Sequence, residues 1–165
     1  MTVKEMAIEF NGKTIKAVIF DLDGTFYRIG FFTKMAFLFH NIRHLTLFSA
    51  HRKVMKELRK EDHGSGEKYF DTLFGRISGL TGTEKTNVKK WYLTDFRKDF
   101  ISALAKNCIK NKSIERVAST LRNLNFKTAV LSDFGFIEER LDALNIDRKL
   151  FNVLVSGEEE GALKP

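Results

Sequence analysis

The sequence predicts an α/β fold in which a Rossmann-like parallel sheet carries an α-helical cap, inserted after the first core strand. The apolar run 17–20 is continuous rather than alternating, which is typical of a parallel strand covered on both faces. Helical spacing of apolar residues extends through 29–112, and strand–helix alternation returns over 113–165. We therefore expect an α/β core formed by 1–28 and 113–165 and a helical cap formed by 29–112.

The strands are expected at short apolar runs. The runs 6–10 and 13–20 flank Asn11-Gly12, a pair that favours a hairpin because both turn residues tolerate positive φ. Two further core strands are expected at 128–131 and 151–155, where apolar residues are again consecutive.

The helices are expected where apolar residues recur every three or four positions. They are predicted near 31–47, 50–61, 66–79 and 84–109 in the cap, and over 113–123 and 136–144 in the core. Thr83 and Ser113 are the predicted N-caps of the helices that follow them, because a hydroxyl can accept a hydrogen bond from a free N–H of the first turn. The acidic run 158–160 is expected in a loop.

The first cap helix is rich in aromatic and aliphatic residues. One face of it carries Phe31, Met35, Leu38, Phe39, Ile42 and Leu45. Charged residues interrupt the segment before it reaches the ~18 apolar residues of a spanning helix. We expect this face to pack on the chain's own domain and expect no membrane partner, with a membrane-surface helix as the minor alternative.

Length and composition exclude several classes of protein. A chain of 165 residues and 19.0 kDa fits one domain, or a small domain with an insertion. The single cysteine, Cys108, excludes a disulfide framework and a cysteine-based zinc site, and we expect it to be a small buried residue. No apolar segment of the kind found in secretory signals follows Met1, so a cytoplasmic location is expected.

Positive charge is concentrated in the middle of the chain. Residues 26–112 hold 18 Lys and Arg against 8 Asp and Glu, whereas the rest holds 10 against 13. A basic surface attracts anions such as phosphorylated metabolites, although Lys-rich helices are commonly just solvated faces. No basic segment is interleaved with aromatic residues, so nucleic acid is not expected as a partner.

The residues most indicative of chemistry follow the buried strand 17–20. Asp21-Leu22-Asp23-Gly24-Thr25 places two carboxylates on a common side of an extended chain, and Gly24 allows a sharp departure from the strand. A polar strand end followed by a turn would show the same residue types, so this segment is not decisive alone. Ligands of open α/β sheets, however, bind beyond the carboxyl ends of the strands.

Two more polar segments follow the other core strands. Ser132-Asp133 comes directly after the second, and Lys164-Pro165 comes after the third. In this order and spacing, the three segments make the sequence resemble the haloacid dehalogenase-like superfamily, in its helical-cap branch of phosphoglycolate phosphatases and β-phosphoglucomutases. The first motif, an apolar strand followed by Asp-x-Asp-Gly-Thr, is the most specific, and the resemblance covers nearly the whole chain.

The resemblance implies a Mg²⁺-dependent phosphatase. Asp21 would attack phosphorus to form an aspartyl-phosphate, and Asp23 would protonate the leaving oxygen and later activate water. Ser132 would donate to a phosphoryl oxygen, and Lys164 would neutralise charge. The carboxylate of Asp21 and the main-chain carbonyl of Asp23 would hold Mg²⁺. Substrate binding is implied for Leu22, Gly24, Thr25 and Asp133. In the family, the acid at position 23 favours phosphoryl transfer over carbon–halogen cleavage.

The cap would close over this site and select the substrate. Its positive charge suits a small, multiply anionic phosphorylated metabolite. Two alternatives stay open: a truncated, weakly active or inactive relative that serves as an anion-binding module, and a phosphomutase that returns the phosphoryl group to a sugar.

The sequence departs from the family in one respect. It stops at Pro165, before the acidic fourth motif that completes the Mg²⁺ site, so we expect either weak metal binding and slow turnover or a fragment of a longer protein. The missing strand would leave one edge of the strand 17–20 uncovered. We expect either the 6–10 hairpin strand or a second copy of the chain, in a homo-oligomer, to cover that edge.

Overall fold

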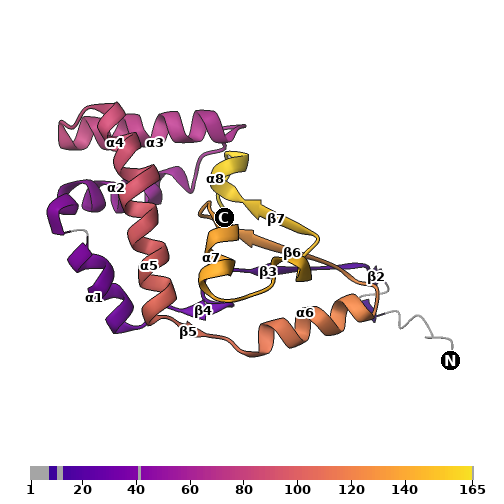
Figure 1. Cartoon of the computed structure of the whole chain (residues 1–165). Helices are drawn as coiled ribbons and strands as arrows, with labels where there is room; N and C mark the ends of the chain where they lie inside the picture. The colour runs from indigo at the N-terminus through magenta and orange to yellow at the C-terminus, as the bar shows by residue number, and fades with distance from the viewer. Residues whose placement is uncertain (1–7, 11–12, 41, 165) are drawn as a thin grey trace, which may run out of the picture.

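The parallel sheet predicted for the core is present. The computed structural model of the chain describes residues 8–10, 13–40 and 42–164, so the predicted turn at Asn11-Gly12 and the last motif residue, Pro165, lie outside the described residues. Three strands, β3 (Ala17–Asp21), β6 (Lys127–Ser132) and β7 (Val153–Ser156), pair in parallel in the order β3-β6-β7. Figure 1 shows this sheet on the right, beside the helical cap. The α/β fold class is therefore confirmed.

One face of the sheet is covered and the other is largely open. Helices α6 (Ser113–Asn123) and α7 (Ile137–Ala143) join Phe20 and Val130 in one buried cluster. The opposite face carries Ile19 and the residues paired with it on β6 and β7. Ile19 is 65% exposed. The predicted burial of both faces of β3 is therefore wrong, because continuous apolarity does not reveal whether a second helical layer is present.

The hairpin forms its own small sheet. Strand β1 (Ile8–Phe10) pairs antiparallel with β2 (Lys13–Ile15), and β3 begins after Lys16 as a separate strand. In the part of the chain that the structure describes, β6 is the hydrogen-bonded neighbour of β3. The expectation that the hairpin covers the edge of β3 is therefore wrong.

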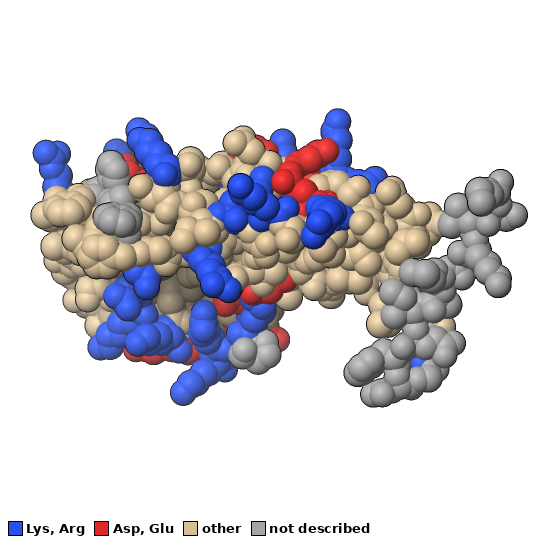
Figure 2. Space-filling model, turned by 90° about the horizontal axis from the view of Figure 1, so that it is seen from below, with Lys and Arg blue, Asp and Glu red and all other residues tan. Residues whose placement is uncertain are grey.

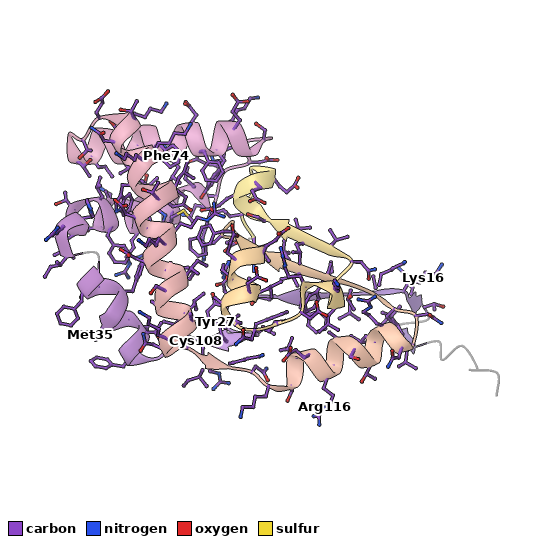
Figure 3. All side chains as sticks on the ribbon, in the orientation of Figure 1. Lys16, Tyr27, Met35, Phe74, Cys108 and Arg116 are labelled. Atoms are coloured by element: carbon purple, nitrogen blue, oxygen red, sulfur yellow. The ribbon has the colours of Figure 1, made fainter. Side chains whose placement is uncertain are left out.

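The helical cap leaves and rejoins the core at a two-stranded ribbon. Its strands, β4 (Tyr27–Arg28) and β5 (Ile109–Lys110), pair antiparallel and were not predicted. Figure 3 shows Tyr27 and Cys108 near this junction; Cys108 is half-buried and packs against the core cluster. Between the two strands lie α1 (Phe31–His40), η1 (Ile42–His44), α2 (Leu45–Leu58), α3 (Gly66–Thr81), α4 (Lys85–Trp91), the π-helical turn η2 (Tyr92–Phe96) and α5 (Arg97–Asn107).

Some helix ends differ from the prediction. The break predicted near residue 48 falls earlier, around η1, because Ala50, Val54 and Leu58 bury one continuous face of α2. Glu84 and Lys112, rather than Thr83 and Ser113, precede the helices α4 and α6, and neither makes a side-chain capping bond.

The apolar face of the first cap helix was expected to pack on the rest of the domain, but it points outward instead. Phe31, Phe39 and Ile42 are all more than half exposed. The side of α1 that faces α5 carries Thr33, whose hydroxyl donates to the carbonyl of Asn107 at 2.5 Å, and Phe37, whose ring packs on Phe96 and Phe100. Within the described residues, no helix is both long and apolar enough to cross a lipid bilayer.

The cap rests on the segment that follows β7. This segment forms a short helix, α8 (Gly157–Glu160), so the predicted loop is wrong. Gly161 has φ 85°, and a Cβ there would lie 2.4 Å from the main chain of Ser65, the N-cap residue of α3. Only glycine allows this approach. Leu163, just beyond, belongs to the hydrophobic cluster of the cap.

Candidate active site

The first carboxylate of the site lies at the end of β3. Lys164 pairs through its Nζ with the Asp21 carboxylate, and the same Nζ lies 3.5 Å from the main-chain carbonyl of Leu131. The main-chain N–H of Lys164 donates to Asp133 at 2.7 Å, which holds the chain after α8 against the end of β6. The Asp21 side chain is 45% exposed, so this ion pair is open to a ligand.

The second carboxylate, Asp23, is 32% exposed and is held by a network of buried donors. It accepts hydrogen bonds from the Tyr27 hydroxyl at 2.5 Å, from the Ser132 hydroxyl at 2.7 Å and from the Arg140 guanidinium. Arg140 is fully buried and also donates to Ser132 at 2.7 Å and to the Tyr27 oxygen at 2.6 Å. Burial raises the pKa of Tyr27 well above its ordinary value, so its hydroxyl keeps the proton that it donates.

The four predicted catalytic residues therefore form two pairs at the carboxyl ends of the strands. Asp21 pairs with Lys164, and Asp23 pairs with Ser132. Among the described residues, no hydrogen bond joins Asp21 to Ser132 directly. Since the Ser132 hydroxyl donates to Asp23, it would have to turn away from that carboxylate to donate to a phosphoryl oxygen.

The four predicted substrate-binding residues occupy different environments. The Leu22 side chain is fully buried, and its N–H continues the sheet by donating to the Leu131 carbonyl at 3.1 Å. Gly24 has φ 87°, as its role in the sharp turn requires, and the Thr25 carbonyl accepts from the Asn111 side chain at 3.1 Å. Asp133 is buried and pairs with Arg59 of the cap at 3.1 Å.

Sequence reasoning missed Arg140. An Arg in the stretch Glu138-Glu139-Arg140 is typical of a solvated helix surface. Its spacing, however, places it on the apolar stripe of α7, between Ile137 and Leu144, and that position is the signal that could have identified it.

Glu158 was also missed. It is fully buried, and its carboxylate accepts from the Tyr92 hydroxyl of the cap at 2.6 Å and from the Gly135 N–H at 2.9 Å. Loss of hydration raises the pKa of Glu158 to about 7, against the opposing effect of these two hydrogen bonds. Glu158 thus joins the cap to the loop after β6.

The oxygen donors of the site suit Mg²⁺. Asp21 supplies one carboxylate, and Asp23 supplies a main-chain carbonyl on the same loop. Mg²⁺ usually takes one or two carboxylates and completes its shell with water and substrate phosphate. Within the described residues, no cluster of three or more His, Cys, Asp and Glu side chains could hold a metal ion by itself. The donor set therefore fits a metal that the substrate helps to hold.

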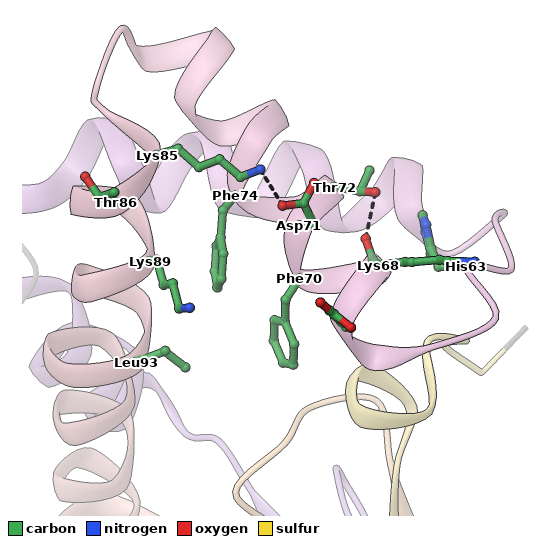
Figure 4. Close-up of a pocket in the computed structure, with 11 residues that line it drawn as sticks. His63, Lys68, Phe70, Asp71, Thr72, Phe74, Lys85, Thr86, Lys89 and Leu93 are labelled. Atoms are coloured by element: carbon green, nitrogen blue, oxygen red, sulfur yellow. Dashed lines mark hydrogen bonds and ion pairs between the residues drawn. The ribbon is translucent and has the colours of Figure 1, made fainter.

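A separate hollow of about 920 Å³ lies on the outer side of the cap, between α3 and α4. Figure 4 shows its lining, in which Lys85 pairs with Asp71 at 2.5 Å. None of the four predicted catalytic residues lines this hollow.

Residues 15–165 match the family described as haloacid dehalogenase-like hydrolase. The chain belongs to this family. Because the match covers nearly all of the chain, the family resemblance predicted from the three motifs is confirmed.

Solved structures show the same fold at low sequence identity. A protein from Haemophilus somnus 129pt, described as a predicted phosphoglycolate phosphatase, aligns with a TM-score of 0.50 and 19% identity over 92% of this chain and 66% of its own. CbbY from Rhodobacter sphaeroides, solved in complex with phosphate, aligns with a TM-score of 0.50 and 16% identity over 87% of this chain and 64% of its own. This chain thus spans less than two thirds of either protein. A search of the curated proteins finds no significant match.

Proposed function

We propose that this hydrolase is a phosphatase that cleaves small phosphomonoesters through an aspartyl-phosphate on Asp21. The observation that carries the proposal is the exposed Asp21–Lys164 pair at the carboxyl end of β3, next to the Asp23–Ser132 pair. A nucleophilic carboxylate, a neutralising ammonium group and a second carboxylate are groups that can carry hydrolysis of a phosphate ester through an aspartyl-phosphate.

In the first step, an oxygen of Asp21 attacks phosphorus and the bond from phosphorus to the ester oxygen breaks. Asp23 gives a proton to that oxygen, so the alcohol leaves neutral. In the second step, Asp23 takes a proton from a water molecule, which attacks the phosphorus of the aspartyl-phosphate. Inorganic phosphate leaves and Asp21 is restored. Lys164 offsets negative charge on the transferred group in both steps.

A bound Mg²⁺ would supply further charge neutralisation, held by the Asp21 carboxylate and the Asp23 carbonyl. The chain's own groups must still hold the proton at Asp23. This carboxylate accepts from Tyr27, Ser132 and Arg140, with two donors on Oδ1 and one on Oδ2, so the proton to be delivered has its place on Oδ2.

To test this proposal, kcat for a panel of phosphomonoesters is measured in the presence of Mg²⁺ for the unchanged chain and for Asp21→Asn. We expect Asp21→Asn to lower kcat by at least about 10³-fold, as loss of a nucleophile does. Asp71→Asn is the matched control, since Asp71 also pairs with a lysine on the surface but lies in the outer hollow of the cap. Equal loss in both variants, or full activity of Asp21→Asn, would refute the proposal.

An anion-binding module is the second candidate, and the three donors that hold Asp23 as a carboxylate favour it, because they stabilise the ionised form that cannot give a proton. In that case no ester is turned over, yet inorganic phosphate binds at Lys164. Absence of hydrolysis in the ester panel, together with calorimetric binding of phosphate that is lost in Lys164→Met, would support the anion-binding module; hydrolysis that Asp21→Asn abolishes would exclude it.

A further inference from the structure

A cavity of about 270 Å³ lies between the cap and the core, and Asp23 forms part of its wall. This volume lies just below the ~300–1,000 Å³ typical of ligand pockets. Six phenylalanine side chains line it: Phe37, Phe48, Phe96 and Phe100 from the cap, and Phe134 and Phe136 from the segment after β6. Residues of both the cap and the core therefore line the cavity. One of them is Asp23, the group that would protonate the leaving oxygen.

The position of Asp23 determines which part of a substrate would occupy this cavity. The inference rests on the proposed function, in which Asp23 gives its proton to the ester oxygen. The phosphoryl group must then lie toward Asp21 and Lys164, since Asp21 attacks it. The alcohol part of the ester extends beyond Asp23, into the cavity.

The chemistry of the walls is aromatic rather than cationic. The ring of Phe37 packs edge-on against Phe96 and Phe100, with centroids 5.4 and 5.8 Å apart, so part of the wall is already formed. Lys34 and Arg52 are the cationic side chains of the described lining, and both are exposed. Figure 2 shows Lys and Arg side chains gathered at the cap end of the molecule, on its outer surface.

His51 adds one polar feature to the lining. It is 3% exposed, its ring lies 4.9 Å from that of Phe96, and neither ring nitrogen has a hydrogen-bond partner within the described residues. Burial lowers the pKa of His51 to about 4, so the ring is neutral near pH 7 and offers one donor and one acceptor. Because an unpaired buried polar group is costly, a ligand group that hydrogen-bonds to His51 would be favoured, and a hydroxyl loses far less hydration in an aromatic cavity than a charged group does.

We propose that this cavity binds the alcohol part of an aryl phosphomonoester: an aromatic group of one or two rings, bearing an uncharged hydroxyl that pairs with His51 when its imidazole turns toward the cavity. This replaces the expectation of a multiply anionic metabolite. The cap's positive charge favours approach of the phosphate, while the aromatic cavity selects the leaving group.

Binding of 2-naphthol, followed by its fluorescence, tests the cavity without requiring turnover. Ala103 lines the cavity and Ala105 is exposed on the same helix, so Ala103→Leu and Ala105→Leu form a matched pair. We expect Ala103→Leu to weaken binding at least tenfold and Ala105→Leu to leave it unchanged. If Ala103→Leu does not fold, Ile29→Trp, at the exposed end of the lining, would also fill the cavity and block ligand binding. No binding, or equal binding in the blocked and control variants, would overturn the inference.

The role of His51 is tested with a second hydroxyl. The unchanged chain should bind 2,6-dihydroxynaphthalene several-fold more tightly than 2-naphthol. His51→Phe keeps a ring but removes both nitrogen atoms, so this preference should vanish while 2-naphthol still binds. A preference that survives in His51→Phe would contradict the assigned hydrogen bond.

Hydrolysis distinguishes failure of this inference from failure of the proposed function. With 2-naphthyl phosphate and glucose 6-phosphate as substrates, we expect kcat/KM at least tenfold higher for the aryl ester. Because naphtholate is also the better leaving group, the share due to the cavity is the part of this preference that Ala103→Leu removes and Ala105→Leu keeps. A preference for the sugar ester would overturn the substrate class while leaving the phosphatase proposal intact. If neither ester is hydrolysed but 2-naphthol binding still responds to Ala103→Leu, the phosphatase proposal fails and the cavity remains a site for aromatic ligands.

Discussion

Asp21 and Asp23 are two residues apart, yet the structure places their carboxylates in contrasting surroundings. Asp21 is paired with Lys164 at an exposed strand end, whereas Asp23 accepts hydrogen bonds from Tyr27, Ser132 and the fully buried Arg140. An exposed pair contributes little to stability and can exchange its partner for a ligand. The charge that holds Asp23 is different, because Arg140 is fully buried and a buried charge is expensive to disturb. In the proposed reaction Asp21 is therefore free to exchange its partner for substrate, whereas Asp23 is also part of the network that stabilises the fold.

Replacing the buried cation should have the largest effect on stability. Arg140→Met removes the guanidinium from Asp23, Ser132 and Tyr27, and we expect the free energy of unfolding to fall by about 3–5 kcal/mol. Arg148→Met is the control, because Arg148 also pairs with carboxylates but on the surface, and it should cost no more than about 1 kcal/mol. Urea unfolding of both variants measures the difference. Equal losses would mean that burial of Arg140 adds nothing.

A third carboxylate, Glu158, sharpens the comparison because it is completely buried. Its pKa of about 7 lies above the ordinary 4.5, so the folded chain binds this proton more tightly than the unfolded chain. Its contribution to stability is complete below pH 4.5 and is lost as the pH rises through 7. His51, with its pKa lowered from 6.5 to about 4, acts in the opposite direction: its contribution is complete above pH 6.5 and is lost as the pH falls toward 4.

The two effects should nearly cancel in the unchanged chain between pH 5 and 8. Glu158→Gln removes one of them, so this variant should gain about 2 kcal/mol of stability from pH 5 to pH 8, the part due to His51. Urea unfolding at the two pH values provides the measurement. The same pH dependence in both proteins would show that Glu158 titrates like an exposed carboxylate.

Loss of the Tyr27 hydroxyl should have an intermediate effect. Tyr27→Phe removes a donor to Asp23 and an acceptor from Arg140 while keeping the buried ring, and should cost about 1–2 kcal/mol. A double-mutant cycle with Arg140→Met should reveal coupling, since both residues belong to one network. Strict additivity would argue that Tyr27 and Arg140 act on Asp23 independently.

The exposed pair should have the smallest effect on stability. Lys164→Met should lower the free energy of unfolding by no more than about 1 kcal/mol, because both partners are partly solvated. It should nevertheless reduce kcat about 10²–10³-fold, as loss of one charge-stabilising group does. A stability loss comparable to that of Arg140→Met would remove the distinction between the two carboxylates.

The sequence alone was sufficient for the fold class, because the strand and helix patterns are local and the three polar segments follow strands that must be parallel. The same patterns predicted the positions of Asp21, Asp23, Ser132 and Lys164 at one sheet edge, and the structure places them there in two hydrogen-bonded pairs. Helix ends were less accurate: Thr83 and Ser113 have the right chemistry for N-caps, yet neither occupies that position.

Only the tertiary structure decided which side chains are enclosed. The spacing of Arg140 on α7 and the acidity of Glu158 are visible in the sequence, but their burial depends on Asp23, Tyr27 and Tyr92, which are distant in the chain. The exposure of Ile19 likewise depends on the absence of a second layer over that face of β3 in the part of the chain that the structure describes. The spacing of apolar residues in the sequence indicates which residues favour burial. The packing of segments that are distant in the chain determines which residues are actually buried and which charged groups form ion pairs.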